Sequence, residues 1–96
     1  MSDLRAIATI PTDPAAGDAV RAGLAELAEA TRGEDGCTSY EVFESAAQPG
    51  VFVTIETWRD QADLDAHMQT AHVARAFETL GSVLTGEVAV HPLTAL

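Results

Sequence analysis

The fold is decided by residues 36–58, which read GCTSYEVFESAAQPGVFVTIETW. Strand-like residues occupy 36–44 and 51–58, and the Gln-Pro-Gly at 48–50 between them is typical of a turn. The stretch therefore predicts a hairpin of two antiparallel strands. In the strand over 51–58 nearly every position on both faces is apolar or β-branched, so we expect both of its faces to be covered.

The residues before the hairpin add one strand and one helix. Leu4 to Ile10 alternates with period two and stops at Pro11, which predicts a strand. Asp13 and Pro14 are a typical N-cap and first helical residue, and apolar residues then recur at helical spacing until Arg32-Gly33. We expect a helix between those two points.

The residues after the hairpin add a second helix and a last strand. Asp60 is the expected cap of this helix, and its inward stripe consists of Leu64, His67, Met68, Ala71, Val73, Phe77, Leu80 and Leu84. Gly81 and Gly86 weaken the end of the helix. The alternation over Glu87–His91 predicts a strand that Pro92 stops. The order β-α-β-β-α-β is typical of a ferredoxin-like α+β fold.

A chain of 96 residues is expected to form a single domain, residues 1–96. Its helices would cover one face of the sheet and leave the other bare, although the strand over 51–58 is apolar on both sides. A second copy of the chain is the simplest cover for the bare face, and the apolar content of 47% supports a homodimer. Cys37 is the only cysteine, so no disulfide within the chain can take the place of a partner.

The charge excludes several classes of partner. Fifteen acidic residues stand against five arginines and no lysine, which gives a formal net charge of −10. Such a chain repels nucleic acid and anionic membrane surfaces. No apolar run approaches the roughly 20 residues of a membrane span, the first residues lack a signal-peptide pattern, and a single cysteine suits a reducing compartment. We expect a cytoplasmic protein that binds neither nucleic acid nor membrane.

Four segments carry a resemblance to a known family: Gly36–Glu41, Phe52–Trp58, Leu64–His67 and His72. With these segments in this order and spacing, essentially the whole chain resembles the antibiotic biosynthesis monooxygenase family. The resemblance implies a dimer in which two ferredoxin-like sheets face one another as an α+β barrel, with a ligand pocket between sheet and helices in each subunit. It also implies oxygenation of polyphenols or quinols without metal or flavin, so no cofactor is expected.

The chain departs from two branches of that family. Some polyphenol oxygenases have an asparagine four residues before the strand tryptophan, where this chain has Thr54. The haem-degrading branch uses an asparagine, a tryptophan and a histidine in its pocket, and this chain contains no asparagine. Haem degradation is therefore disfavoured, and the residue roles of the polyphenol oxygenases do not carry over unchanged.

Oxygenation without a cofactor requires a base and a dry pocket, because the substrate must lose a proton before it gives an electron to dioxygen. His67 is the candidate base, since its ordinary pKa of about 6.5 lets it accept a proton near neutrality. Trp58 is the candidate to stack on an aromatic, quinol or polyketide-type substrate and to donate its indole N–H to the developing anion. The other candidates for substrate contact are Tyr40, Phe52, Thr54, Glu56, His72 and Phe77.

A metal site is not expected from the histidine spacing. His72 follows His67 by five residues, which places it about 140° around a continuous helix, whereas a helix holds zinc with histidines four residues apart. Only a helix break near Thr70 would favour a role for His72.

Several alternatives stay open. His67 and Trp58 also suit a core, Glu56 can pair with Arg59 or Arg75, and Cys37 is expected to be a packed small residue. A dimer that binds a small ligand without turnover would use the same pocket. An isomerase or lyase acting on a small carbonyl compound would use His67 but not dioxygen.

Overall fold

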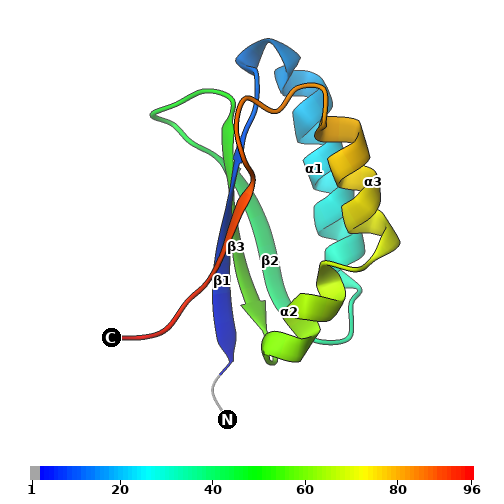
Figure 1. Ribbon diagram of the computed structural model, residues 1–96, viewed down its shortest axis with the longest axis vertical. Helices are drawn as coiled ribbons and strands as arrows, with labels where there is room; N and C mark the ends of the chain where they lie inside the picture. Colours follow the sequence, from blue (N-terminus) through cyan, green and yellow to red (C-terminus); the bar gives the residue numbers. More distant parts are fainter. Residues whose placement is uncertain (1–2) are drawn as a thin grey trace.

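The computed structural model describes residues 3–96 and contains one antiparallel sheet with helices on one of its faces (Figure 1). Its elements are β1 (Leu4–Pro11), the 3-10 turn η1 (Pro14–Ala16), α1 (Gly17–Arg32), β2 (Cys37–Glu44), β3 (Val51–Trp58), α2 (Gln61–His67), α3 (Ala71–Leu80) and β4 (Ala89–Pro92). The strands lie in the order β2-β3-β1-β4. The predicted α+β ferredoxin-like fold is confirmed.

The second helix is not continuous, contrary to the single helix expected after Asp60. It ends at His67 and restarts at Ala71 because Thr70 acts as a new N-cap, with an extended backbone and a hydroxyl that accepts from the Val73 N–H at 3.3 Å. The same hydroxyl donates to the carbonyl of His67 at 2.7 Å. Thr70 therefore closes one helix and opens the next.

The last strand is shorter than expected and starts two residues later, at Ala89 rather than Glu87. Pro92 is part of this strand and pairs with Ala6. A proline is tolerated there because β4 is an edge strand with no further neighbour.

The face of the sheet under the helices carries the core. In β3, Phe52, Thr54, Glu56 and Trp58 are buried, whereas the residues between them are partly or largely exposed. The main buried cluster consists of Ile10, Val20, Leu24, Leu27, Phe52, Val73 and Leu80. A second cluster consists of Ala6, Ala28, Tyr40, Trp58 and Leu64. Thr54 and Glu56 are the buried polar residues of β3.

The opposite face of the sheet has no helix over it (Figure 1). Ile7 pairs directly with Ile55, and Phe43 pairs with Val53, so these side chains share that face. Phe43 is 48% exposed and Ile55 38% exposed. We call these four residues the bare sheet face. Within residues 3–96, no helix has the length and apolar character needed to cross a membrane.

Candidate active site

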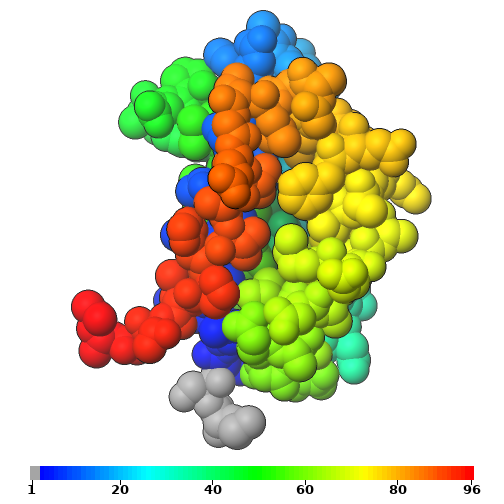
Figure 2. All heavy atoms as spheres, in the orientation of Figure 1, coloured from blue at the N-terminus to red at the C-terminus, as the bar shows by residue number. Residues whose placement is uncertain are grey.

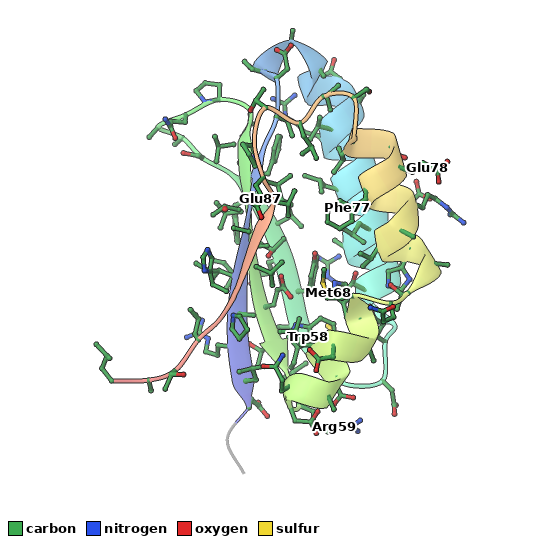
Figure 3. The ribbon with its side chains drawn as sticks, viewed as in Figure 1. Trp58, Arg59, Met68, Phe77, Glu78 and Glu87 are labelled. Carbon is green, nitrogen blue, oxygen red and sulfur yellow. The ribbon has the colours of Figure 1, made fainter. Side chains whose placement is uncertain are left out.

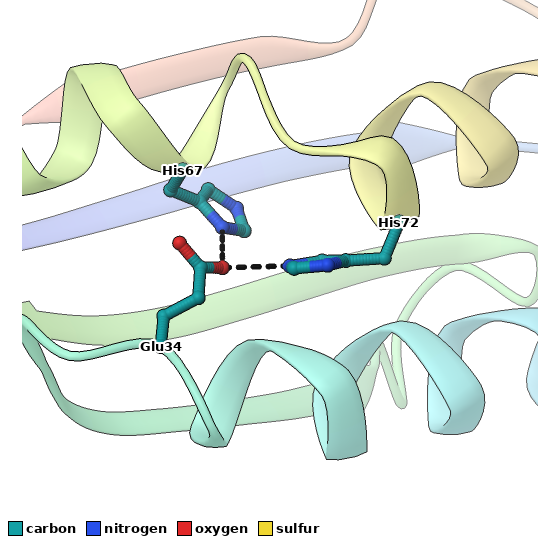
Figure 4. Close-up of side chains that lie close together, drawn as sticks. All are labelled: Glu34, His67 and His72. Atoms are coloured by element: carbon teal, nitrogen blue, oxygen red, sulfur yellow. Dashed lines mark hydrogen bonds and ion pairs between the residues drawn. The ribbon is translucent and has the colours of Figure 1, made fainter.

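The break between α2 and α3 brings two histidines to one carboxylate. His67 Nδ1 lies 2.6 Å and His72 Nε2 lies 2.7 Å from the same oxygen, Oε2 of Glu34 (Figure 4). His67 is buried, Glu34 is mostly buried, and the His72 side chain is 25% exposed. The Glu34–His67–His72 cluster joins three elements that are separated in the sequence.

Local structure fixes the position of each member of the cluster. Glu34 follows α1 in a turn in which its N–H donates to the Thr31 carbonyl at 3.0 Å and its own carbonyl accepts from the Cys37 N–H at 3.1 Å. His67 is the last residue of α2, and His72 is in the first turn of α3. Glu34 lies just after α1, and the two histidines lie on either side of the break between α2 and α3. The turn after α1 and this break therefore decide where the three side chains point.

The hydrogen bonds of Glu34 determine which nitrogen of His67 is free. A carboxylate oxygen only accepts, so the two ring nitrogens that face it carry hydrogens. A neutral His67 with its hydrogen on Nδ1 has a lone pair on Nε2. Within residues 3–96, Nε2 of His67 has no hydrogen-bond partner. Every side-chain nitrogen or oxygen without a partner in that range is at least slightly exposed, so Nε2 is accessible. The His67 side chain also lines the cavity described next, so His67 with its unpartnered Nε2 is the candidate base of this cavity.

A narrow apolar cavity of about 50 Å³ lies between the sheet and the helices. Its polar members are Tyr40, Thr54, Glu56 and His67, and its remaining walls are Ala8, Ile10, Leu24, Leu27, Met68, Val73, Ala76, Phe77, Leu80, Val88 and Val90. Met68 and Phe77 are partly exposed and form its rim, and Figure 3 shows Phe77 on the side of α3 that faces the sheet. In Figure 2 the orange chain that leads into β4 borders yellow α3 on the surface.

Glu56 is a buried carboxylate, 2% exposed, with two donors from its own strand. Its oxygens accept from the Trp58 indole N–H at 2.8 Å and from the Thr54 hydroxyl at 2.5 Å. The Thr54 hydroxyl in turn accepts from the Ala8 N–H at 2.9 Å. Neither of the two arginines that the sequence left open as partners of Glu56 pairs with it, because Arg59 pairs with Asp63 and Arg75 with Glu26.

Trp58 is 0% exposed and does not line the cavity. It packs beside His67, and its N–H is already committed to Glu56. The structure therefore does not present Trp58 as a stacking surface or as a donor to a substrate. This corrects the expectation from the sequence, which could not tell that the neighbouring carboxylate takes the indole hydrogen.

Tyr40 offers the donor that Trp58 does not. Its ring is 3% exposed and lies 5.7 Å from the His67 ring, and it lines the cavity. Burial, followed by the charge of Glu56, raises the pKa of Tyr40, so the phenol keeps its hydrogen. The Tyr40 hydroxyl has no hydrogen-bond partner in the described chain and is not fully buried, so it is the candidate hydrogen-bond donor of the cavity that Tyr40 lines.

Four other sequence candidates lie in different places. Thr54 and Phe77 line the cavity, as expected for substrate contact, but Phe52 belongs to the main buried cluster and does not. His72 lies outside the cavity, in a groove between α1 and α3. Burial raises the pKa of the half-buried Cys37 thiol. The sequence did not identify Glu34, because its partners are 33 and 38 residues away.

Comparison with known proteins gives consistent matches. A sequence model described as "Antibiotic biosynthesis monooxygenase" matches residues 3–79. "Putative monooxygenase Rv0793" of Mycobacterium tuberculosis is 38% identical over 95 residues, which cover 99% of this chain and 93% of that protein. "Putative monooxygenase YcnE" of Bacillus subtilis is 36% identical over 62 residues, which cover 60% of this chain and 65% of that protein.

Solved structures match over nearly the full length. A crystal structure described as an antibiotic biosynthesis monooxygenase superposes with a TM-score of 0.90 at 35% identity, covering 97% of this chain and 98% of that one. The structure of Rv0793 gives a TM-score of 0.87, covering 99% and 96%. PA3566 of Pseudomonas aeruginosa gives 0.88 at 31% identity, covering 100% and 96%.

Proposed function

Since this chain belongs to the antibiotic biosynthesis monooxygenase family, we propose that it is a cofactor-independent monooxygenase for a small aromatic, quinol or polyketide-type substrate. One observation carries the proposal. His67 is held by Glu34 at Nδ1, its Nε2 has no hydrogen-bond partner within residues 3–96, and its side chain lines a narrow apolar cavity. That arrangement supplies the base and the dry pocket that such chemistry requires.

The first step is proton removal from the substrate. His67 Nε2 takes the hydrogen of a phenol placed in the cavity, and the ring becomes an imidazolium. The Glu34 carboxylate accepts from Nδ1 at 2.6 Å and stabilises that positive charge. Glu34 acts through His67 and is a positioning residue.

The second requirement is to hold the resulting anion away from water. The Tyr40 hydroxyl donates a hydrogen bond to the phenolate oxygen, while the apolar walls exclude solvent. The electron-rich ring then reduces dioxygen directly. For a quinol, one oxygen atom enters the ring and the other leaves as water, so a quinol and O₂ give a hydroxyquinone and H₂O. The substrate supplies all four electrons, and no other reductant is needed.

Access to the cavity depends on its rim. A volume of about 50 Å³ is far below the roughly 300–1,000 Å³ of pockets that enclose small ligands. Met68 and Phe77 are the partly exposed side chains at the rim. Rotation of these two side chains would enlarge the opening without disturbing the core clusters.

We also propose a homodimer formed through the bare sheet face. Ile7, Phe43, Val53 and Ile55 form a connected apolar surface that no helix among residues 3–96 covers. A second copy brings an identical surface, so the match is self-complementary. This surface is on the opposite side of the sheet from the cavity, which leaves the rim of each cavity free.

Oxygen consumption by purified protein with a panel of quinols tests the catalytic proposal. Wild-type protein should consume about one O₂ per product, and His67→Ala should lower the rate by about 100-fold or more. Turnover that persists without oxygen would instead indicate isomerase or lyase chemistry. Saturable quinol binding without turnover would indicate a ligand-binding protein.

A further inference from the structure

The Glu34–His67–His72 cluster contains more potential metal-ligand atoms than a general base requires. We propose that it is also a binding site for a divalent transition-metal ion such as Zn²⁺, held by one carboxylate oxygen and two imidazole nitrogens. The three ligand atoms lie within 4.8 Å of one another. This inference does not rest on the proposed function, because it requires neither substrate nor oxygen.

The donor set suits such an ion. Zinc binds imidazole nitrogen at about 2.0–2.1 Å and carboxylate oxygen at about 2.0–2.2 Å, and two histidines with one carboxylate leave a fourth position open to water. Ligand atoms around a tetrahedral ion are separated by roughly 3.3 Å. Glu34 Oε2 now lies 2.6 Å and 2.7 Å from the two nitrogens. An ion would therefore require the carboxylate to withdraw from each nitrogen by less than about 1 Å, and the two nitrogens, which lie within 4.8 Å of each other, to approach by up to about 1.5 Å.

The three side chains differ in freedom in a way that allows this adjustment. His67 is buried between Trp58 and Tyr40 and provides a fixed ligand. Glu34 lies in a turn, and His72 lies in the first turn of α3 with a quarter of its side chain exposed. Figure 4 shows both reaching the same point from opposite sides. Adjustment of the Glu34 and His72 side chains would let both close on an ion that His67 holds.

Solvent can deliver the ion without passing through the cavity. His72 lines the groove between α1 and α3, whose other members include Glu26 and Arg75. The formal net charge of −10 raises the local concentration of cations around the chain. The metal site would therefore load from the helix side, whereas substrate would arrive past the rim of the cavity.

Metal and base are alternative uses of the same histidine. Without metal, Nδ1 of His67 and Nε2 of His72 carry hydrogens that point at Glu34. A bound ion needs lone pairs at those two atoms. The hydrogen of His67 then moves to Nε2, so the imidazole that lines the cavity carries a donor at that nitrogen. Metal-loaded protein would thus present no base to a substrate.

Calorimetric titration of EDTA-treated, dialysed protein with Zn²⁺ tests the proposal. We expect one ion per chain, and His72→Ala should weaken binding by more than about 100-fold, since even outer partners of a metal contribute about 10–100-fold. His91→Ala is the matched control, because His91 is exposed on β4 on the other side of the molecule, and its affinity should equal that of wild type. Circular dichroism confirms that each variant is folded.

Nitrogen NMR of the imidazole rings identifies the ligand atoms independently of affinity. On addition of Zn²⁺ the signals of His67 Nδ1 and His72 Nε2 should move to coordinated values, whereas His91 should not change. Equal binding by wild type and His72→Ala, or absence of a saturable site, would overturn the inference. Both experiments omit substrate, so their failure would leave the oxygenase proposal intact, and failure of turnover would leave the metal site intact.

Discussion

The rings of Trp58 and His67 lie with their centroids 4.8 Å apart and their planes inclined by 41°. They come from β3 and from the end of α2, which make few other contacts with each other. The indole donates its N–H to Glu56 while its face supports the imidazole. Trp58 therefore packs against the candidate base, and its N–H is already committed to Glu56.

Replacement of that indole tests its structural role. Trp58→Phe keeps an aromatic ring beside His67 but removes one of the two donors of the buried Glu56 carboxylate. We expect the free energy of unfolding in urea to fall by about 1–3 kcal/mol. Phe77→Leu, which alters an exposed aromatic, should have a smaller effect. Equal stability of Trp58→Phe and wild type would show that Glu56 does not depend on the indole.

Glu34 should affect turnover more than substrate binding. In Glu34→Gln the side-chain amide can donate to His67 Nδ1, which favours the tautomer with its hydrogen on Nε2 and removes the base from the cavity. We expect kcat to fall by at least about tenfold with little change in KM. Glu26→Gln, on the surface of α1, is the control. A change in KM alone would assign Glu34 to binding instead.

Replacement of Tyr40 should lower kcat while leaving the free energy of unfolding nearly unchanged. Tyr40→Phe removes a hydroxyl that has no partner within the described residues, so the free energy of unfolding should change by less than about 1 kcal/mol. If the hydroxyl donates to the substrate anion, kcat should fall by about 10- to 100-fold. Unchanged kcat with intact folding would remove Tyr40 from the mechanism.

Glu44 predicts a defined pH dependence of stability. A hydrogen bond from the Gly50 N–H, and then one from Arg21, lower the pKa of Glu44 from its ordinary 4.5. A carboxylate with a lowered pKa in the folded state stabilises the fold above its unfolded pKa, and this contribution is lost as pH falls through the folded value. Glu44→Gln should therefore be less stable than wild type at pH 7, with the difference disappearing in strong acid. Urea unfolding at both pH values measures it.

The bare sheet face predicts the assembly state. Ile55→Asp places a charge at the centre of that face, and the variant should sediment as a single chain at concentrations where wild type sediments as a dimer. Phe77→Asp alters a comparably exposed aromatic on α3 and should leave the dimer unchanged. A wild-type protein that remains a compact single chain at micromolar concentration would contradict the proposed dimer.

The strands and the first helix could be predicted because their signals are local. Alternation in Leu4–Ile10 and 51–58 needs no knowledge of distant residues, and the Gly50 turn is marked by its own residues. The break at Thr70 was harder to predict. Thr70 is a typical N-cap, but the apolar residues before and after it keep helical spacing, which favours one continuous helix. Thr70 prevails since its hydroxyl bonds to both sides of the break.

The candidate site was only partly predictable for a different reason. His67 was identified because it lies on the inward apolar stripe of the predicted helix. The two-residue period of the strand placed Glu56 on the same face of the sheet as Trp58. The partner of Glu56 stayed open in the sequence, because a pattern shows which face a side chain shares but not which hydrogen it accepts. Glu34 carries no local signal at all, and only the arrangement of α1, α2 and α3 brings it to the histidines.

The three residues between α2 and α3 decide whether the two histidines act together. A relative with the same histidines on one unbroken helix would direct them to different sides, and it would lack the cluster despite matching this chain at both positions. Residue identity is thus an insufficient criterion for tracing this site through a set of sequences. The helix-interrupting threonine and the carboxylate after the first helix have to be inherited together with the histidine pair.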